Sequence, residues 1–79
     1  MSKSEFIYHN RTLFVNLSGN YNRQSIINLR NKLYSIIDQY GINDIVIDRK
    51  LISNMDNNAF YDMLDDYDVR YGGHLTVEE

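Results

Sequence analysis

The feature that most constrains the fold is an amphipathic helix, which the sequence predicts from about Gln24 to Tyr40. Its apolar residues recur at steps of three and four positions, as on one face of a helix: Ile26, Leu29, Leu33, Ile36, Ile37 and Tyr40. Asn22 is placed to cap the first turn, and Gly41 can end the helix in a left-handed conformation. The opposite face is expected in solvent, with Asn28, Asn31, Lys32, Ser35 and Asp38. Such a helix needs an apolar surface to pack on.

Two segments that flank this helix predict the strands on which it packs. From Thr12 to Leu17 every second residue is apolar, and Ser18-Gly19 ends the strand. After the helix, Asn43 to Asp48 predicts a buried strand that ends in a carboxylate. Its run Ile45 to Ile47 is continuous, which is typical of a strand covered on both faces. Because a helix connects the two strands, we expect them to pair in parallel.

The remaining segments add two strands and a second helix. Glu5 to His9 predicts a short strand that turns through Asn10-Arg11 into a hairpin, so the sheet is expected to be mixed. Asp56 is placed to cap a second helix, whose apolar residues again have helical spacing: Ala59, Phe60, Met63, Leu64 and Tyr67. Gly72-Gly73 is expected to stop this helix before a last strand, Leu75 to Val77. The predicted order is ββαβαβ, an α/β fold.

Composition narrows the class of protein. Seventy-nine residues predict one domain, residues 1–79, and the absence of cysteine rules out disulfides and favours a cytoplasmic location. The first residues lack the apolar run of a signal peptide, and no stretch is apolar for long enough to insert in a membrane. The net charge is −3, and the eight Lys and Arg are scattered, so we expect no binding to nucleic acid.

The sequence offers no arrangement typical of catalysis, and we expect no enzyme activity, cofactor or metal. His9 and His74 lie at predicted strand ends without ligands at metal-binding spacing. Ser18-Gly19 has neither the flanking glycines of a nucleophile elbow nor those of a phosphate loop. Four acids of the second helix would point in diverging directions, so they predict a solvated face rather than a calcium site: Asp62, Asp65, Asp66 and Asp68.

The order of these segments resembles the STAS family, the sulphate transporter and anti-sigma factor antagonist domains. The likeness runs from Glu5 to Val77 and is carried by six segments in order: Thr12 to Gly19, the helix from about Gln24 to Tyr40, Asp44 to Asp48, Leu51-Ile52, Met55-Asp56 and Tyr71 to Val77. No single motif is unique to the family, so the order and spacing carry the resemblance. It implies a small mixed sheet with its helices on one side, and regulation of a bacterial type through contacts between proteins.

Full-length STAS domains continue beyond this last strand into a further helix, so the chain looks truncated at its C-terminus relative to the family. The flank beside Leu75 to Val77 is therefore expected to be polar or to be buried against another chain.

The resemblance also identifies an unusual residue at the start of the second helix. Members that are switched by phosphorylation carry Ser or Thr directly after the residue that corresponds to Asp56, where this chain has Asn57. Asn has no hydroxyl to phosphorylate, so the usual switch is expected to be absent. Ser53 is the nearest hydroxyl, but it precedes the turn. Asn22 also replaces an acid that is common in the family.

Two functions remain open at this point. The first is an interaction module that resembles an antagonist fixed in its unphosphorylated form and binds an anti-sigma factor, a kinase-like protein or an assembly subunit. The second is a structural subunit or homo-oligomer, and binding of a nucleotide is a minor third possibility. The predicted partner-binding residues follow the strand ends and open the second helix: Asn20, Tyr21, Asn22, Arg23, Ser53, Asn54, Asp56, Asn57, Asn58, Tyr61 and Asp62.

Overall fold

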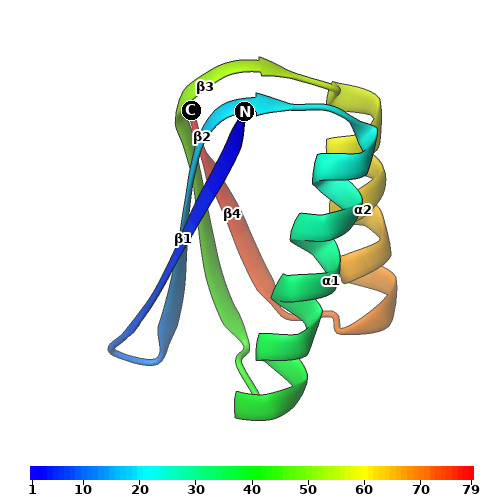
Figure 1. Ribbon diagram of the computed structural model, residues 1–79. Helices are drawn as coiled ribbons and strands as arrows, with labels where there is room; N and C mark the ends of the chain where they lie inside the picture. The colour runs from blue at the N-terminus through cyan, green and yellow to red at the C-terminus, as the bar shows by residue number, and fades with distance from the viewer.

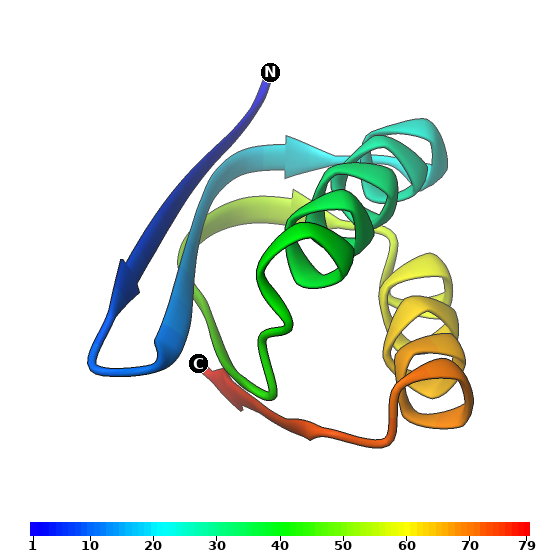
Figure 2. The same cartoon turned by 90° about the horizontal axis from the view of Figure 1, so that it is seen from below.

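A computed structural model describes all 79 residues. The elements follow in the order β1 (Ser2–His9), β2 (Thr12–Tyr21), α1 (Arg23–Tyr40), β3 (Asp44–Met55), α2 (Asn57–Arg70) and β4 (His74–Glu78). The strands form one sheet in the order β1-β2-β3-β4, in which β1 is antiparallel to β2 and the other pairs are parallel. Both helices lie on the same side of this sheet (Figures 1 and 2). The predicted mixed sheet, element order and one-sided helices are confirmed.

The ends of α1 are those that its local sequence predicts. The Asn22 side-chain oxygen accepts a hydrogen bond from the Ser25 N–H at 2.8 Å, which caps the first turn. Gly41 has a φ of 63°, and its N–H donates to the Ile37 carbonyl at 2.7 Å. The helix begins at Arg23, one position before the expected start. Neither α1 nor α2 combines the length and the apolar character needed to cross a bilayer.

The hairpin of β1 and β2 turns at the predicted dipeptide. Asn10 and Arg11 have φ values of 51° and 64°, the left-handed pair that a tight two-residue turn requires. The hairpin is longer than predicted, because β1 begins at Ser2 and pairs as far as Gly19. Gly19 has a φ of 86°, and a side chain there would collide with the Met1 carbonyl.

The core lies between the sheet and the two helices. Five inward-facing residues of β2 and β3 are at most 2% exposed and pack with the buried faces of α1 and α2: Leu13, Val15, Leu17, Ile45 and Ile47. Val46 alternates with them and is only half-buried, because no helix covers the other face of the sheet. The prediction that this strand is covered on both faces was therefore wrong.

The third strand also continues where the sequence predicted its end. After Asp48, β3 keeps pairing in parallel with β2 from Ser18 opposite Leu51 to Tyr21 opposite Met55. Two irregularities in the register accommodate this extension. As a result, β2 and β3 reach the starts of both helices together.

Candidate interaction site

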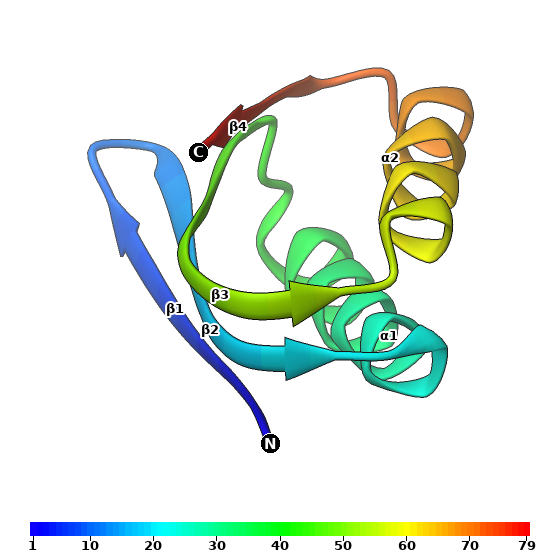
Figure 3. The same cartoon turned by 90° about the horizontal axis from the view of Figure 1, so that it is seen from above.

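The ends of β2 and β3 bring the starts of the two helices side by side (Figures 1 and 3). The Asp56 N–H donates to the Tyr21 carbonyl at 2.8 Å, which joins the two strand-to-helix junctions. Between them lies an open hollow of about 570 Å³. Its lining comes from both junctions and from the start of β1: Met1, Ser2, Asn20, Tyr21, Asn22, Ser25, Asn54, Met55 and Asp56. Parallel sheets commonly bind their ligands at this edge, beyond the carboxyl ends of the strands.

Several predicted partner-binding residues meet in or beside this hollow. Asn20, Asn22, Asn54 and Asp56 all line it. The exposed Ser53 hydroxyl donates to the Asn20 side-chain oxygen at 3.0 Å, which links the two strand ends on the surface. The hollow therefore presents amides, serine hydroxyls and the Asp56 carboxylate, groups suited to hydrogen bonds with another chain.

The structure places Tyr21 in the core rather than on the partner-binding surface. Its side chain is 4% exposed, and its hydroxyl donates to the Lys3 carbonyl of β1. Burial raises the pKa of this hydroxyl, as expected for a phenol that is removed from water. Tyr21 therefore anchors the end of the sheet and, although it lines the hollow, its side chain offers little surface to a partner.

The first turn of α2 holds Asn57, at the position where phosphorylated members of the STAS family carry Ser or Thr. Asp56 caps the helix, since its side-chain oxygen accepts from the Ala59 N–H at 3.1 Å. Asn57 and Asn58 follow it and are exposed. The Arg49 guanidinium donates to the Asn57 side-chain oxygen at 3.0 Å and lies 5.0 Å from the Phe60 ring centroid. The Arg49 guanidinium therefore lies beside Asn57.

The predicted residues on the helices do not all face the hollow. Tyr61 is 49% exposed and packs edge-on against Phe60, with 5.5 Å between the ring centroids. Arg23 and Asp62 instead line a separate groove between the two helices. The predicted surface therefore has two parts, the hollow with the start of α2 and the groove between the helices.

The acids of α2 also differ from one another. The Tyr34 hydroxyl donates to a carboxylate oxygen of Asp66 at 2.7 Å, and the Arg70 Nε lies 3.7 Å from the same oxygen. Burial, together with this carboxylate, raises the pKa of Tyr34 far above its usual range. Asp66 therefore helps to hold the helices together, whereas the other three acids are exposed and form no ion pair: Asp62, Asp65 and Asp68. Nowhere do three or more histidine or acidic side chains gather closely enough to hold a metal ion.

Comparison with known proteins identifies the fold. No family model matches the sequence, and neither does any curated protein. The anti-sigma factor antagonist SpoIIAA in its unphosphorylated form is similar in structure, with a TM-score of 0.68 and 16% identity over 98% of this chain and 71% of that chain. The Bacillus cell fate determinant SpoIIAA in the phosphorylated form gives a TM-score of 0.64 and 14% identity, over 95% of this chain and 68% of that chain.

A third solved structure, named Mglu, has a TM-score of 0.72 and 14% identity over 95% of this chain, which spans only 19% of that protein. At such low identities the likeness lies in the fold, and the order of strands and helices described above is what the proteins share. The chain therefore has a STAS-like fold, that of the anti-sigma factor antagonist SpoIIAA.

Proposed function

We propose that the protein is a non-enzymatic STAS-like interaction module of the cytoplasm, which binds an anti-sigma factor or a related kinase-like protein. It does so through a docking surface that comprises Asn20, Asn22, Ser53, Asn54, Asp56, Asn57, Asn58 and Tyr61. The fold supports the proposal, because two of the similar structures are those of an anti-sigma factor antagonist. Arg23 and Asp62, in the groove between the helices, form the rim of the same contact.

The observation that carries the proposal is the state of Asn57. The amide has no hydroxyl to receive a phosphate, and its oxygen already accepts a hydrogen bond from Arg49 at 3.0 Å. SpoIIAA, in contrast, has been solved with and without its phosphate. The docking surface of this protein would therefore be permanently competent to bind, because no added charge can repel or recruit the partner there.

Calorimetric titration against anti-sigma factors with a kinase domain, purified one at a time from the same genome, tests this proposal. We expect one of them to bind, and Asn57→Asp to weaken binding roughly tenfold, because it places a negative charge where the family's phosphate would lie. Asn28→Asp makes the same chemical change on the exposed face of α1 and is expected to leave the affinity unchanged. Failure of every candidate to bind, or equal binding by the Asn57 variant, would contradict the proposal.

The position of Ser53 provides a second check. If Asn57 fixes the module in one state, protein isolated from cells should carry no phosphate on the Ser53 hydroxyl, which already donates to Asn20. Intact-mass and peptide mass spectrometry measure this directly. Stoichiometric phosphate on Ser53 would show a reversible switch and would exclude a permanently competent surface.

The alternative function, a structural subunit or homo-oligomer, is favoured by the edge of the sheet. Strand β4 pairs only with β3, so one side of its backbone is free. Leu75 and Val77 are half-buried and line a groove with Leu64 of α2. Under this function, light scattering of the purified protein gives a dimer or a larger species, and the anti-sigma factors have no effect on it. A monomer that binds one of them favours the interaction module.

A further inference from the structure

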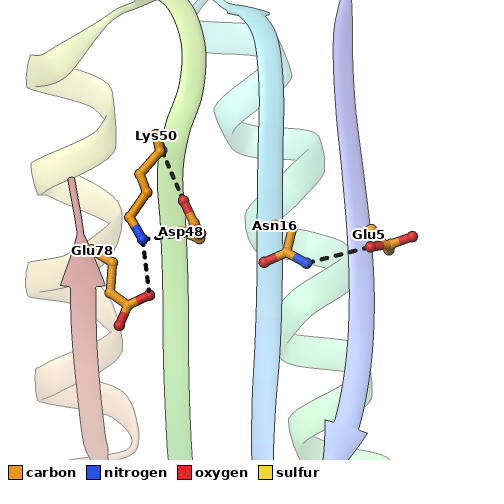
Figure 4. A network of polar contacts seen from close by, with 5 residues as sticks. All are labelled: Glu5, Asn16, Asp48, Lys50 and Glu78. Carbon is orange, nitrogen blue, oxygen red and sulfur yellow. Dashed lines mark hydrogen bonds and ion pairs between the residues drawn. The ribbon is translucent and has the colours of Figure 1, made fainter.

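The face of the sheet that no helix covers has an ordered surface of its own. The strand registers align its side chains in rows that run across all four strands. One row joins Ile7 to Phe14, Phe14 to Val46 and Val46 to Thr76, and we call Ile7, Phe14 and Val46 the apolar row. The neighbouring row joins Glu5, Asn16, Asp48 and Glu78, and we call it the acidic row. Figure 4 shows the acidic row with Lys50.

The apolar row leaves hydrophobic side chains in contact with water. Ile7 is 45% exposed and Phe14 is 37% exposed, and Val46 beside them is half-buried. Single exposed hydrophobic residues are ordinary on protein surfaces, but these three are direct neighbours on adjacent strands and form a continuous strip. The strip can gain free energy from an apolar partner surface that excludes this water.

The acidic row carries more negative charge than its neighbours neutralise. The Lys50 ammonium lies 3.9 Å from a carboxylate oxygen of Asp48 and 3.9 Å from one of Glu78. Glu5 has only a hydrogen bond from the Asn16 amide, at 3.3 Å. Lys50 thus pairs with two of the three carboxylates, and Lys3 lines a hollow together with Glu5, so the three carboxylates have two cations near them. These contacts are exposed and weak, so the side chains can reorient toward cations supplied by another molecule.

We infer that this face is a second docking site, and that it binds an amphipathic helix of a partner protein with an apolar stripe beside a stripe of Lys or Arg. The helix lies across the strands, with its apolar stripe on the apolar row and its basic stripe on the acidic row. Neighbouring strands are about 4.8 Å apart, close to the spacing of about 5–6 Å between side chains three or four positions apart on a helix. Rows two residues apart along a strand are separated by roughly 6.7 Å, enough for two adjacent stripes of one helix.

The charge of the face selects this occupant over a second copy of the chain. The protein carries a net charge of −3, and a second copy would add further uncompensated acids to the contact. An extended strand is also a poor occupant, because the backbone groups in the middle of the sheet are already paired with their neighbours. The inference goes beyond the proposed function, since the docking surface and this face are built from different residues.

Titration of the full ¹⁵N-labelled chain with two synthetic helical peptides of about 14 residues tests the inference. Both peptides carry the same leucine stripe, flanked by lysines in one and by glutamates in the other. We expect saturable binding of the lysine peptide, with NMR shift changes at the apolar and acidic rows, and roughly tenfold weaker binding of the glutamate peptide. Equal binding of the two peptides, no binding, or shift changes confined to the helices would overturn the inference. So would a free protein that already dimerises through this face.

Matched variants separate the two rows from a general effect of charge or hydrophobicity. Glu78→Gln should weaken binding of the lysine peptide by roughly threefold, whereas Asp65→Asn removes the same charge from the helix side and should change nothing. Phe14→Thr should weaken it roughly fivefold, whereas Val69→Thr, at a residue of α2 that is 88% exposed, should not. Thermal unfolding checks that each variant is folded. An equal loss of affinity for the lysine peptide in a variant and in its control would contradict the inference. Loss of anti-sigma factor binding with peptide binding intact would affect only the proposed function.

Discussion

The two faces of the sheet are formed by the same strands, but α1 and α2 cover one face and leave the other in contact with water (Figures 1 and 2). On the face toward the helices, Val15 and Ile47 are completely buried. One residue earlier on each strand, Phe14 and Val46 point to the uncovered face and stay in contact with water. Phe14 and Val46 are as hydrophobic as Val15 and Ile47, so at these positions the placement of the helices decides which side chains form the core and which remain free for contact with a partner.

The largest expected difference between the two faces is that between two neighbouring truncations in β3. Ile47→Ala removes buried methyl and methylene groups and leaves a cavity, so we expect it to lower the free energy of unfolding by about 2–4 kcal/mol. Val46→Ala removes a half-exposed side chain and should cost less than about 1 kcal/mol. Urea unfolding followed by circular dichroism measures both. Similar losses in the two variants would mean that the second face is covered as well.

Two aspartates that accept backbone N–H groups extend the comparison to polar residues. Asp56→Ala removes the cap of α2 on the covered side and should cost about 1 kcal/mol. Asp48 accepts the Lys50 N–H at 2.8 Å on the uncovered face, where water can replace it. Asp48→Ala should therefore cost at most about 0.5 kcal/mol. Urea unfolding measures both variants. A larger loss of unfolding free energy in Asp48→Ala than in Asp56→Ala would contradict this expectation.

Alkaline pH is expected to weaken the covered side selectively. Burial raises the pKa of Tyr34 and that of Tyr67, so the folded protein holds these phenolic protons more tightly than the unfolded chain. The associated stability is present below about pH 10 and is lost as the pH rises further, because the unfolded state releases the protons first. Urea midpoints measured between about pH 8 and pH 11 should fall less steeply for Tyr34→Phe than for the wild type. Tyr40→Phe, which removes an exposed hydroxyl, is the control, and an unchanged slope in Tyr34→Phe would exclude this cause.

A small effect should also come from Tyr67, and its sign is the informative part. Its hydroxyl is buried without a hydrogen-bond partner, beside Gly73, where an added side chain would collide with it. Tyr67→Phe removes an unsatisfied polar group, so the free energy of unfolding should stay the same or rise by up to about 1 kcal/mol. A clear loss of stability would mean that, in solution, the Tyr67 hydroxyl does form a hydrogen bond with another group of the folded chain.

Local signals in the sequence were enough to predict much of the fold. The apolar spacing of α1, its cap at Asn22 and its end at Gly41 all depend on neighbouring residues, and the same holds for the Asn10-Arg11 turn and the cap at Asp56. The full length of β3 could not be predicted, because the segment after Asp48 lacks alternation and is a strand only through its pairing with β2.

The candidate site was predicted less well for the same reason. Contact between Arg49 and Asn57 requires the extended β3, so no local pattern indicated it. For Tyr21 a signal was present. It follows Leu13, Val15 and Leu17 at even spacing, which is the phase of the buried face, once the strand is allowed to continue beyond Gly19. The identity of a partner depends on a second molecule and therefore remains a proposal.

The parallel pairing of β2 with β3 also affects how fast the chain can fold. The β1–β2 hairpin needs only a two-residue turn, and hairpins of this kind form within about 1–10 μs. β3, in contrast, cannot pair with β2 until the chain that includes α1 and connects them has folded back onto one face of the sheet, so the loss of chain entropy comes before the contacts that offset it. Until β3 joins, the edge of β2 that β3 will occupy stays unpaired, and in that interval a newly made chain is most prone to aggregate.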